Sequence, residues 1–153
     1  MKSLQQVAAR QLLSPRPHIY NGKLLIDNSP AQGSHHTYLL IAHVSHLEPT
    51  FPIAPQQSPL SSTVSIMHIG PISGEELMDI MSTVYDNSRH LKMEQVGFAQ
   101  EVSNVQFEVD EKEERWRRIC IDGKIISLEN GARINLQMCN EIELGEKKIS
   151  LYI

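Results

Sequence analysis

The stretch from Trp116 to Leu136, WRRICIDGKIISLENGARINL, carries the clearest folding signal in the chain. Alternating residues lead into Asp122-Gly123, continue through Lys124 to Leu128, and resume after Glu129-Asn130-Gly131. An Asp-Gly or Asn-Gly pair between alternating segments predicts a β-hairpin, because both central residues of a type I′ turn need positive φ. Two hairpins in a row predict an antiparallel meander.

The composition is that of an ordinary globular protein. At 153 residues, with 41% hydrophobic and 21% charged residues, the chain is long enough to bury one core without disulfides or metals. We therefore expect a single domain over residues 1–153. The formal net charge of -4 argues against nucleic acid as a partner, since phosphate binding needs clustered basic residues. The one dense basic cluster is Arg115, Arg117 and Arg118.

No segment has the apolar length of a signal peptide or of a membrane span, so a cytoplasmic protein is expected. Cys120 and Cys139 form no CxxC pair, which favours buried thiols in a reducing compartment. The chain begins with a predicted helix whose apolar residues share one face. This helix fits the last helix of a preceding domain or a short cap on a sandwich. Its apolar residues are Leu4, Val7, Ala8 and Leu12.

Most of the remaining chain is predicted to form short strands. Residues 37–44, TYLLIAHV, are almost continuously apolar, which predicts a central strand covered on both faces. Residues 47–60 carry four prolines and cannot lie in the middle of a sheet. Asn21-Gly22 indicates a strand or hairpin, and residues 27–36 a polar loop. The expected strands are 18–26, 37–44, 63–69, 96–102, 105–109, 116–121, 124–128, 133–139 and 149–153.

One helix is predicted at about residues 73–86. Ser73 and Glu76 have the spacing of a capping box, in which each side chain accepts a hydrogen bond from the other residue's backbone N–H. The residues that follow form an apolar stripe for packing on a sheet. The predicted fold is thus an antiparallel β-sandwich with one packed helix. The stripe consists of Leu77, Ile80, Met81 and Val84.

The sequence lacks the usual catalytic motifs. Its eight glycines stand singly, so no GxGxxG, Walker loop or GGDGT stretch can cradle phosphates. It contains neither a GxSxG nucleophile motif nor an HExxH zinc motif. Structural roles are favoured for His68 and His90. The histidines closest in sequence, which lack the spacing of a metal site, are the pairs His35-His36 and His43, His46.

Four other polar segments have a structural explanation that is favoured over a functional one. Asp110 to Glu114 reads as a solvated turn, and Ser61-Ser62 as a loop. Asp122 beside glycine is explained by turn chemistry, although a catalytic role is the alternative. Trp116 and the neighbouring arginines could form a binding patch through stacking, but packing at the start of a strand is favoured.

Five stretches, taken in order, resemble the C-terminal lobe of the diacylglycerol kinase and sphingosine kinase family of lipid kinases, in particular its fungal members. The resemblance covers roughly residues 15–140. It includes a strand leading to a proline-bearing loop, a strand followed by a helix, and a hairpin with Asp-Gly. The stretches are TYLLIAHVSHLEPTFPIAP (37–55), VSIMHIGPISGEELMDIM (64–81), YDNSRH (85–90), VGFAQ (96–100) and WRRICIDGKI (116–125).

The resemblance implies a β-sandwich lobe that packs on an α/β lobe carrying GGDGT. ATP, Mg²⁺ and a lipid would lie in the cleft between the lobes, with Asp122, Gly123 and Lys124 facing it as nucleotide-binding residues. The implied partners are the N-terminal kinase lobe, the lipid substrate and a membrane surface. Without GGDGT, this chain alone is expected to bind no cofactor and to catalyse no transfer.

Two positions depart from the family pattern. The family has Asp-Gly after the proline loop, where this chain has Ser61-Ser62, and Asp-Gly-Glu in the late hairpin, where it has Lys124. The lysine reverses a charge. The alternative function is therefore a non-catalytic sandwich that binds lipid, a membrane surface or a protein. A sandwich that binds a cyclic nucleotide or sugar is a third possibility, because fold does not determine function.

Overall fold

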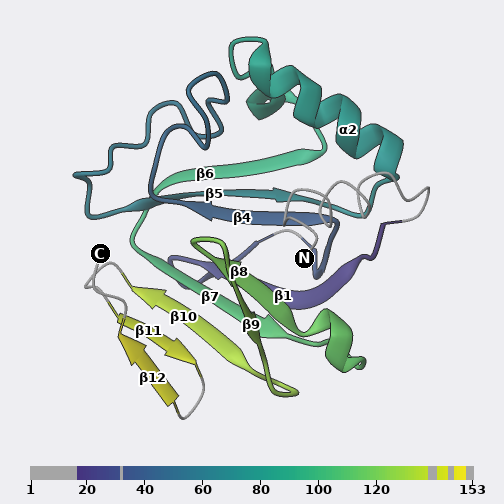
Figure 1. Cartoon of the computed structure of the whole chain (residues 1–153), viewed down its shortest axis with the longest axis vertical. Coiled ribbons are helices and arrows are strands. Elements are labelled where there is room, and N and C mark those ends of the chain that lie inside the picture. The colour runs from purple at the N-terminus through teal and green to yellow at the C-terminus, as the bar shows by residue number, and fades with distance from the viewer. Residues whose placement is uncertain (1–16, 32, 138–140, 145–146, 151–153) are drawn as a thin grey trace. The chain divides into compact units, whose positions relative to one another are not determined.

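A computed structural model describes residues 17–31, 33–137, 141–144 and 147–150 (Figure 1). The chain divides into two compact units, the first Met1–Ile19 with His36–Glu101, the second Tyr20–His35 with Val102–Ile153. The predicted N-terminal helix, Cys139 and the end of the last predicted strand lie outside the described residues. Cys120 is exposed, so the prediction of a buried thiol is wrong at this position. Most of the described structure is antiparallel β-sheet with one short α-helix, which confirms the β-dominated fold class.

The first unit contains a three-stranded sheet in the order β4 (Tyr38–Ala42), β5 (Val64–Ile69) and β6 (Val96–Val102). The prediction that residues 37–44 form the central strand is wrong. β4 has a neighbour on one side only in this sheet, and its residues are mostly half-buried. The central position belongs to β5, where every residue except His68 is buried. Pairing with β4 and β6 leaves β5 without an exposed edge, and its Met67 and Ile69 lie in the hydrophobic core of this unit.

Helix α2 (Gly74–Ser82) begins at the predicted capping box. The Ser73 Oγ accepts a hydrogen bond from the backbone N–H of Glu76, and Glu76 Oε2 accepts one from the backbone N–H of Ser73 at 2.8 Å. The helix ends in the 3₁₀ helix η1 (Thr83–Tyr85), and η2 (Arg89–Lys92) follows. The predicted apolar stripe of the helix packs in the core of this unit. Its buried members there are Leu77, Ile80 and Val84, with Met81 partly buried against them.

The second unit is built on a seven-stranded sheet in which each strand from β12 to β2 pairs antiparallel with the next. Along the sheet the order is β12, β11, β10, β7, β1 and β2, and β3 also pairs with β1. Strand β11 was not predicted from the sequence. The strands are β1 (Tyr20–Ile26), β2 (Ser29–Pro30), β3 (His35–His36), β7 (Asn104–Val109), β10 (Arg133–Gln137), β11 (Glu141–Leu144) and β12 (Lys147–Ser150).

The turn of the first hairpin lies at Asp27-Asn28 and not at Asn21-Gly22. Asp27 and Asn28 have φ of 46° and 65°, as a type I′ turn requires, and they connect β1 to β2. Asp27 Oδ1 also accepts hydrogen bonds from the backbone N–H groups of Ser103 and Asn104. Gly22 lies inside β1, where the ring of Phe107 occupies the space that a side chain would need. The segment predicted as a polar loop thus starts with a hairpin.

The hairpin predicted at Asp122-Gly123 is confirmed. It joins β8 (Arg118–Ile121) to β9 (Lys124–Ser127), and its two central residues have φ of 47° and 81°. The predicted meander is wrong, because β10 pairs with β7 and not with β9. Of Asn130-Gly131 only the glycine has positive φ, at 71°, so this turn is not type I′ and does not bring its flanking strands together.

The acidic segment Asp110 to Glu114 is not a fully solvated turn, contrary to prediction. Glu111 is only 4% exposed, and its Oε1 accepts a 2.7 Å hydrogen bond from the backbone N–H of Asn21. A buried carboxylate needs such donors to compensate for lost hydration. The chain then forms the 3₁₀ helix η3 (Glu114–Trp116), so β8 begins at Arg118 and not at Trp116. No helix among the described residues is long and apolar enough to cross a membrane.

Candidate functional site

The proline-bearing loop between β4 and β5 is fixed to the first unit by buried residues. Ile53 and Ala54 are almost completely buried in its core. Gln57 is buried too, and its Nε2 donates a 2.7 Å hydrogen bond to the carbonyl oxygen of Thr63. Its Oε1 accepts a hydrogen bond from the Ser65 hydroxyl on β5 at 2.9 Å. A segment that prolines exclude from a ladder satisfies its backbone by such side-chain bonds.

The segment between η1 and η2 holds this loop from the other side. Asn87 and Ser88 have left-handed φ of 49° and 58°, which turns the chain back toward the loop. The Ser88 hydroxyl donates to the carbonyl oxygen of Pro52 at 3.0 Å, and His90 Nε2 to that of Ile53 at 3.2 Å. The structural role predicted for His90 is confirmed, because its Nε2 makes the hydrogen bond that holds the loop. Its Nδ1 is buried without a hydrogen-bond partner among the described residues.

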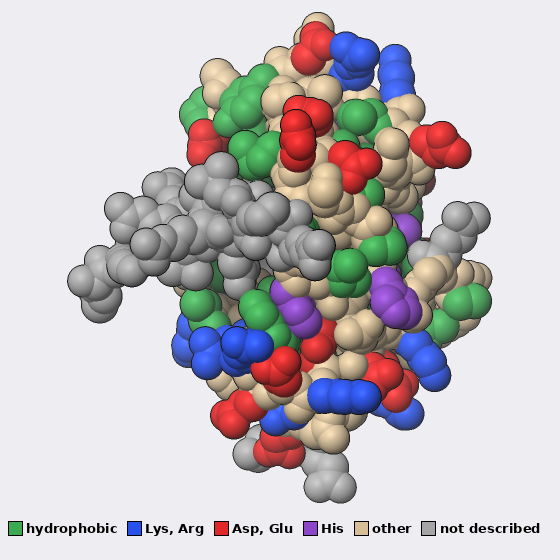
Figure 2. All heavy atoms as spheres, turned by 90° about the vertical axis from the view of Figure 1, so that its right-hand side faces the viewer, with side chains coloured by type: hydrophobic (Ala, Val, Ile, Leu, Met, Phe, Trp, Pro, Cys, Tyr) green, Lys and Arg blue, Asp and Glu red, His purple; other side chains and the backbone are tan. Residues whose placement is uncertain are grey.

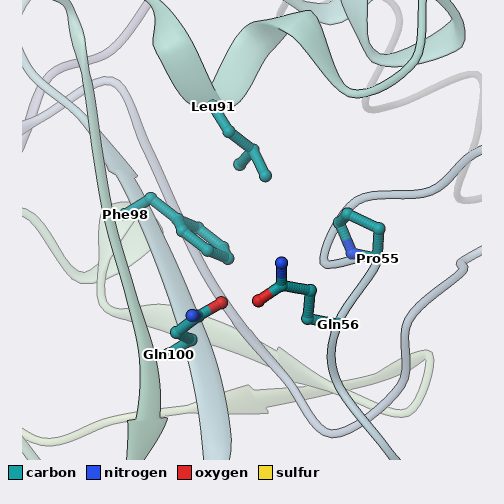
Figure 3. A pocket seen from close by; sticks show the side chains of 5 residues that line it. All are labelled: Pro55, Gln56, Leu91, Phe98 and Gln100. Carbon is teal, nitrogen blue, oxygen red and sulfur yellow. The ribbon is translucent and has the colours of Figure 1, made fainter.

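A hollow of about 280 Å³ opens where the loop, η2 and β6 meet (Figure 3). Phe98 and Gln100 are two positions apart on β6 and so lie on one face of the strand. The Gln56 amide on the loop points toward that of Gln100 (Figure 3). Three stretches of the family resemblance, or residues directly beside them, meet here. The lining residues are Pro55, Gln56, Leu91, Phe98 and Gln100.

The lining residues of the hollow were not predicted individually from the sequence. A signal was nevertheless present, because VGFAQ was one of the resembling stretches and Pro55 ended another. The sequence did not show that these two stretches lie close together in space, because β5 and α2 separate the loop from β6 in the chain. A glutamine in a loop also has no local signature of binding.

The predicted nucleotide-binding residues lie together at the tip of the β8–β9 hairpin. Asp122, Gly123 and Lys124 are all exposed there. The Asp-Gly pair is accounted for by turn geometry. Because the three residues supply one carboxylate and the cation Lys124, they do not by themselves fit a Mg²⁺ site. In the described part of the chain, no group of three His, Cys, Asp or Glu side chains could hold a metal ion.

The histidines make pairwise contacts. The rings of His36 and His68 meet edge to face with centroids 5.9 Å apart, and burial lowers the pKa of His68, with a further contribution from His36. His43 Nε2 lies 2.8 Å from the carbonyl oxygen of Ser61, and His46 Nδ1 bonds to the Ser45 hydroxyl. The His43 contact joins two segments of the loop between β4 and β5. Ser61 and Ser62 lie in a loop, as predicted, and the Ser61 hydroxyl bonds to that of Thr63.

The aromatic and basic residues before β8 contact one another. The Trp116 ring packs edge to face on Tyr20 at 6.3 Å, and the Arg115 guanidinium lies 5.0 Å from its centroid. Arg115 also pairs with Glu113 at 2.8 Å, which offsets its charge. The Tyr20 contact is the packing favoured for Trp116, and the Arg115 contact is the stacking that the alternative named. Figure 2 shows acidic and basic side chains interspersed on the face that it draws.

Comparison with models of known protein families and with curated proteins found no match to this chain. The family resemblance therefore depends on the stretches quoted from the sequence. Their positions in the fold are informative for that reason. The first and third stretches are joined by the hydrogen bonds of Ser88 and His90 to the proline-bearing loop, and the fourth contributes Phe98 and Gln100 to the hollow. The second stretch forms β5 and α2, and the fifth forms the β8–β9 hairpin.

Proposed function

We propose that this chain is the C-terminal lobe of an ATP-dependent lipid kinase. Together with a nucleotide-binding lobe, it would transfer the γ-phosphate of ATP to a hydroxyl of diacylglycerol or a sphingoid base. The observation that carries the proposal is the contact between two of the resembling stretches. Ser88 and His90, from YDNSRH, bind the carbonyl oxygens of Pro52 and Ile53 in the proline-bearing stretch.

The remaining stretches support the same proposal. The second begins with β5 and ends in α2, which are the strand and helix that the resemblance implies. The fifth contains the Asp-Gly turn of a regular hairpin. The arrangement of the sheets as a sandwich, and the docking of a second lobe, belong to the proposal.

The chemistry assigns different tasks to the two lobes. Phosphoryl transfer depends mainly on positioning and on stabilisation of charge, and the GGDGT stretch that would hold phosphates is not in these 153 residues. This lobe would supply part of the lipid site and the hairpin that carries Asp122 and Lys124. The phosphate-binding loop, the Mg²⁺ ligands and the base would come from the other lobe.

Reconstitution tests the proposal. The chain alone, incubated with radiolabelled ATP and either dioctanoylglycerol or sphingosine, should transfer no phosphate. The same chain mixed with a separately produced lobe carrying GGDGT should co-elute with it in size-exclusion chromatography and phosphorylate the lipid. Transfer by the isolated chain would contradict the role given to the second lobe. A stable complex without transfer would favour a non-catalytic function.

That alternative, a sandwich that binds lipid, membrane or protein without catalysis, has one observation in its favour. Lys124 replaces the acidic residue of the family, and Asp122 is explained by its turn alone. Capture of this chain by lipid vesicles, with no phosphate transfer in any combination of lobes, would identify this case.

A further inference from the structure

Two Asn-Gly pairs in the chain have the same chemistry but lie in opposite surroundings. In such a pair the backbone nitrogen of glycine can attack the side-chain carbonyl carbon of asparagine, because glycine has no Cβ that hinders the approach. The reaction needs a glycine N–H that is not held elsewhere and room for a succinimide ring to close. The two pairs are Asn21-Gly22 and Asn130-Gly131.

The first pair is held inside a strand by backbone hydrogen bonds. Gly22 lies on β1, and its N–H donates to the carbonyl oxygen of Ser34 at 3.0 Å. The Asn21 N–H donates to Glu111 Oε1 at 2.7 Å, and the Asn21 carbonyl oxygen accepts from the N–H of Asp110 at 2.9 Å. The attacking nitrogen is therefore engaged, and the asparagine backbone cannot rotate toward it without breaking these bonds.

The two glycines also differ in the space around them. At Gly22, the Phe107 ring and the carbonyl oxygen of Glu108 occupy the position where a Cβ would stand, the oxygen at 2.7 Å. At Gly131, nothing lies within 4 Å of that position. A ring that includes the glycine nitrogen can close only at the second site while the fold is intact.

The second pair lies at the exposed tip of the connection between β9 and β10. The Gly131 N–H makes no hydrogen bond to another described residue. The chain is fixed on either side of the tip, by burial of Leu128 and by a 3.0 Å hydrogen bond from the Val109 N–H to the carbonyl oxygen of Ala132. Asn130 can thus react without opening of the strands that flank it.

We propose that Asn130 is a site of spontaneous deamidation in the folded protein and that Asn21 is protected from it. The Gly131 nitrogen bonds to Cγ of Asn130, the Cγ–Nδ2 bond breaks, and the proton of the Gly131 N–H leaves with Nδ2 as ammonia. Water then opens the succinimide, at the side-chain carbonyl to give aspartate or at the backbone carbonyl to give isoaspartate. One water enters and one ammonia leaves. The reaction needs no enzyme or oxidant and is independent of the proposed kinase function.

Incubation of the full chain in mildly alkaline buffer, followed by tryptic digestion and mass spectrometry, tests the proposal. Trypsin releases the two sites on separate peptides, residues 11–23 and 125–133. In the folded chain Asn130 should convert at least about a hundredfold faster than Asn21. That ratio corresponds to about 2.8 kcal/mol for opening β1, which lies within the range for paired strands. Equal conversion of both sites would overturn the proposal.

The unfolded chain is the internal control. In concentrated guanidinium chloride both pairs lose their surroundings, so Asn21 and Asn130 should convert at similar rates. If Asn130 does not convert in the folded chain over a time in which both sites convert in the denaturant, the proposal is wrong.

Two variants and one exchange measurement complete the test. Asn130→Gln should remove most of the ammonia that the folded chain releases, because glutamine closes a larger ring and reacts far more slowly. Asn21→Gln, the matched control, keeps the backbone bonds of β1 and should release as much as the unaltered chain. In hydrogen exchange followed by NMR, the Gly22 N–H should be protected and the Gly131 N–H should not. Unchanged ammonia release from Asn130→Gln, or equal exchange at the two glycines, would overturn the proposal.

Discussion

His90 Nε2 lies 3.2 Å from the carbonyl oxygen of Ile53, a residue 37 positions earlier, and the two residues are 0% and 1% exposed. Because the carbonyl can only accept, Nε2 carries the hydrogen and Nδ1 is bare in the neutral ring. This bond joins the proline-bearing loop to the segment after the helix. The hollow lies beside it, between Pro55 and Leu91.

Removing the donor of this bond should destabilise the first unit. His90→Phe keeps a ring of similar size and leaves the buried carbonyl of Ile53 without a partner, so the free energy of unfolding should fall by about 1–3 kcal/mol. Urea unfolding followed by circular dichroism measures it. His46→Phe, at an exposed histidine whose bond to Ser45 is also exposed, is the control and should change stability little. Equal stability of both variants would show that the bond contributes nothing.

Stability should fall as the pH falls below about 6.5. Burial lowers the pKa of His90, partly offset by the bond to Ile53, and burial together with His36 lowers that of His68. In the unfolded chain both rings recover a pKa near 6.5, so between that value and the lower folded pKa the unfolded state binds more protons. The stability that these two histidines contribute is therefore fully present above about pH 6.5 and is lost as the pH falls toward their lower folded pKa values. Urea titrations between pH 5 and 7.5 should show this slope, and His90→Phe should reduce it.

Gly22 should tolerate no side chain. A Cβ at this position would meet the Phe107 ring and lie 2.7 Å from the carbonyl oxygen of Glu108, a backbone atom of a paired strand that cannot move aside. Gly22→Ala should cost about 1–3 kcal/mol through overpacking. Gly70→Ala is the matched control, since nothing lies within 4 Å of a Cβ there. A Gly22→Ala protein as stable as the control in thermal unfolding would contradict the strand pairing.

Lys124→Glu should change the activity of the reconstituted kinase. Under the proposed function, the hairpin faces the nucleotide. The family has an acidic residue at the position of Lys124, and the substitution introduces one there. A favourable interaction of about 1 kcal/mol at an exposed site corresponds to about a fivefold increase in transfer rate at limiting ATP and Mg²⁺. Lys112→Glu makes the same charge change at another exposed lysine. If both variants change the rate equally, net charge is the cause and the hairpin is not near the nucleotide.

Features formed by neighbouring residues were correctly predicted from the sequence. The Ser73–Glu76 capping box joins residues three positions apart, and the Asp122-Gly123 turn needs positive φ at two adjacent residues. The apolar stripe of α2 depends only on helical spacing. These interactions depend only on residues within a few positions of one another, so a short segment of sequence is enough to predict them.

Non-local choices were predicted incorrectly or not at all. Nothing between Asn130 and Leu136 states that β10 pairs with β7, and the buried bond between Glu111 and Asn21 spans 90 positions. Asn21-Gly22 has the sequence of a turn, yet pairing with β7 draws it into a strand. The energy of strand pairing and burial exceeds a local turn preference, and which partner is chosen depends on all segments that compete for it.

By itself the sequence determined where the helix starts, where one hairpin turns and which face of the helix is apolar, since these depend on backbone preferences and side-chain chemistry within a few positions. Only the tertiary structure decided which strand is central, which carboxylate is buried, and that Gln56 and Gln100 share one hollow. The physical reason is distance along the chain: contacts between remote segments form only when the whole unit closes around them.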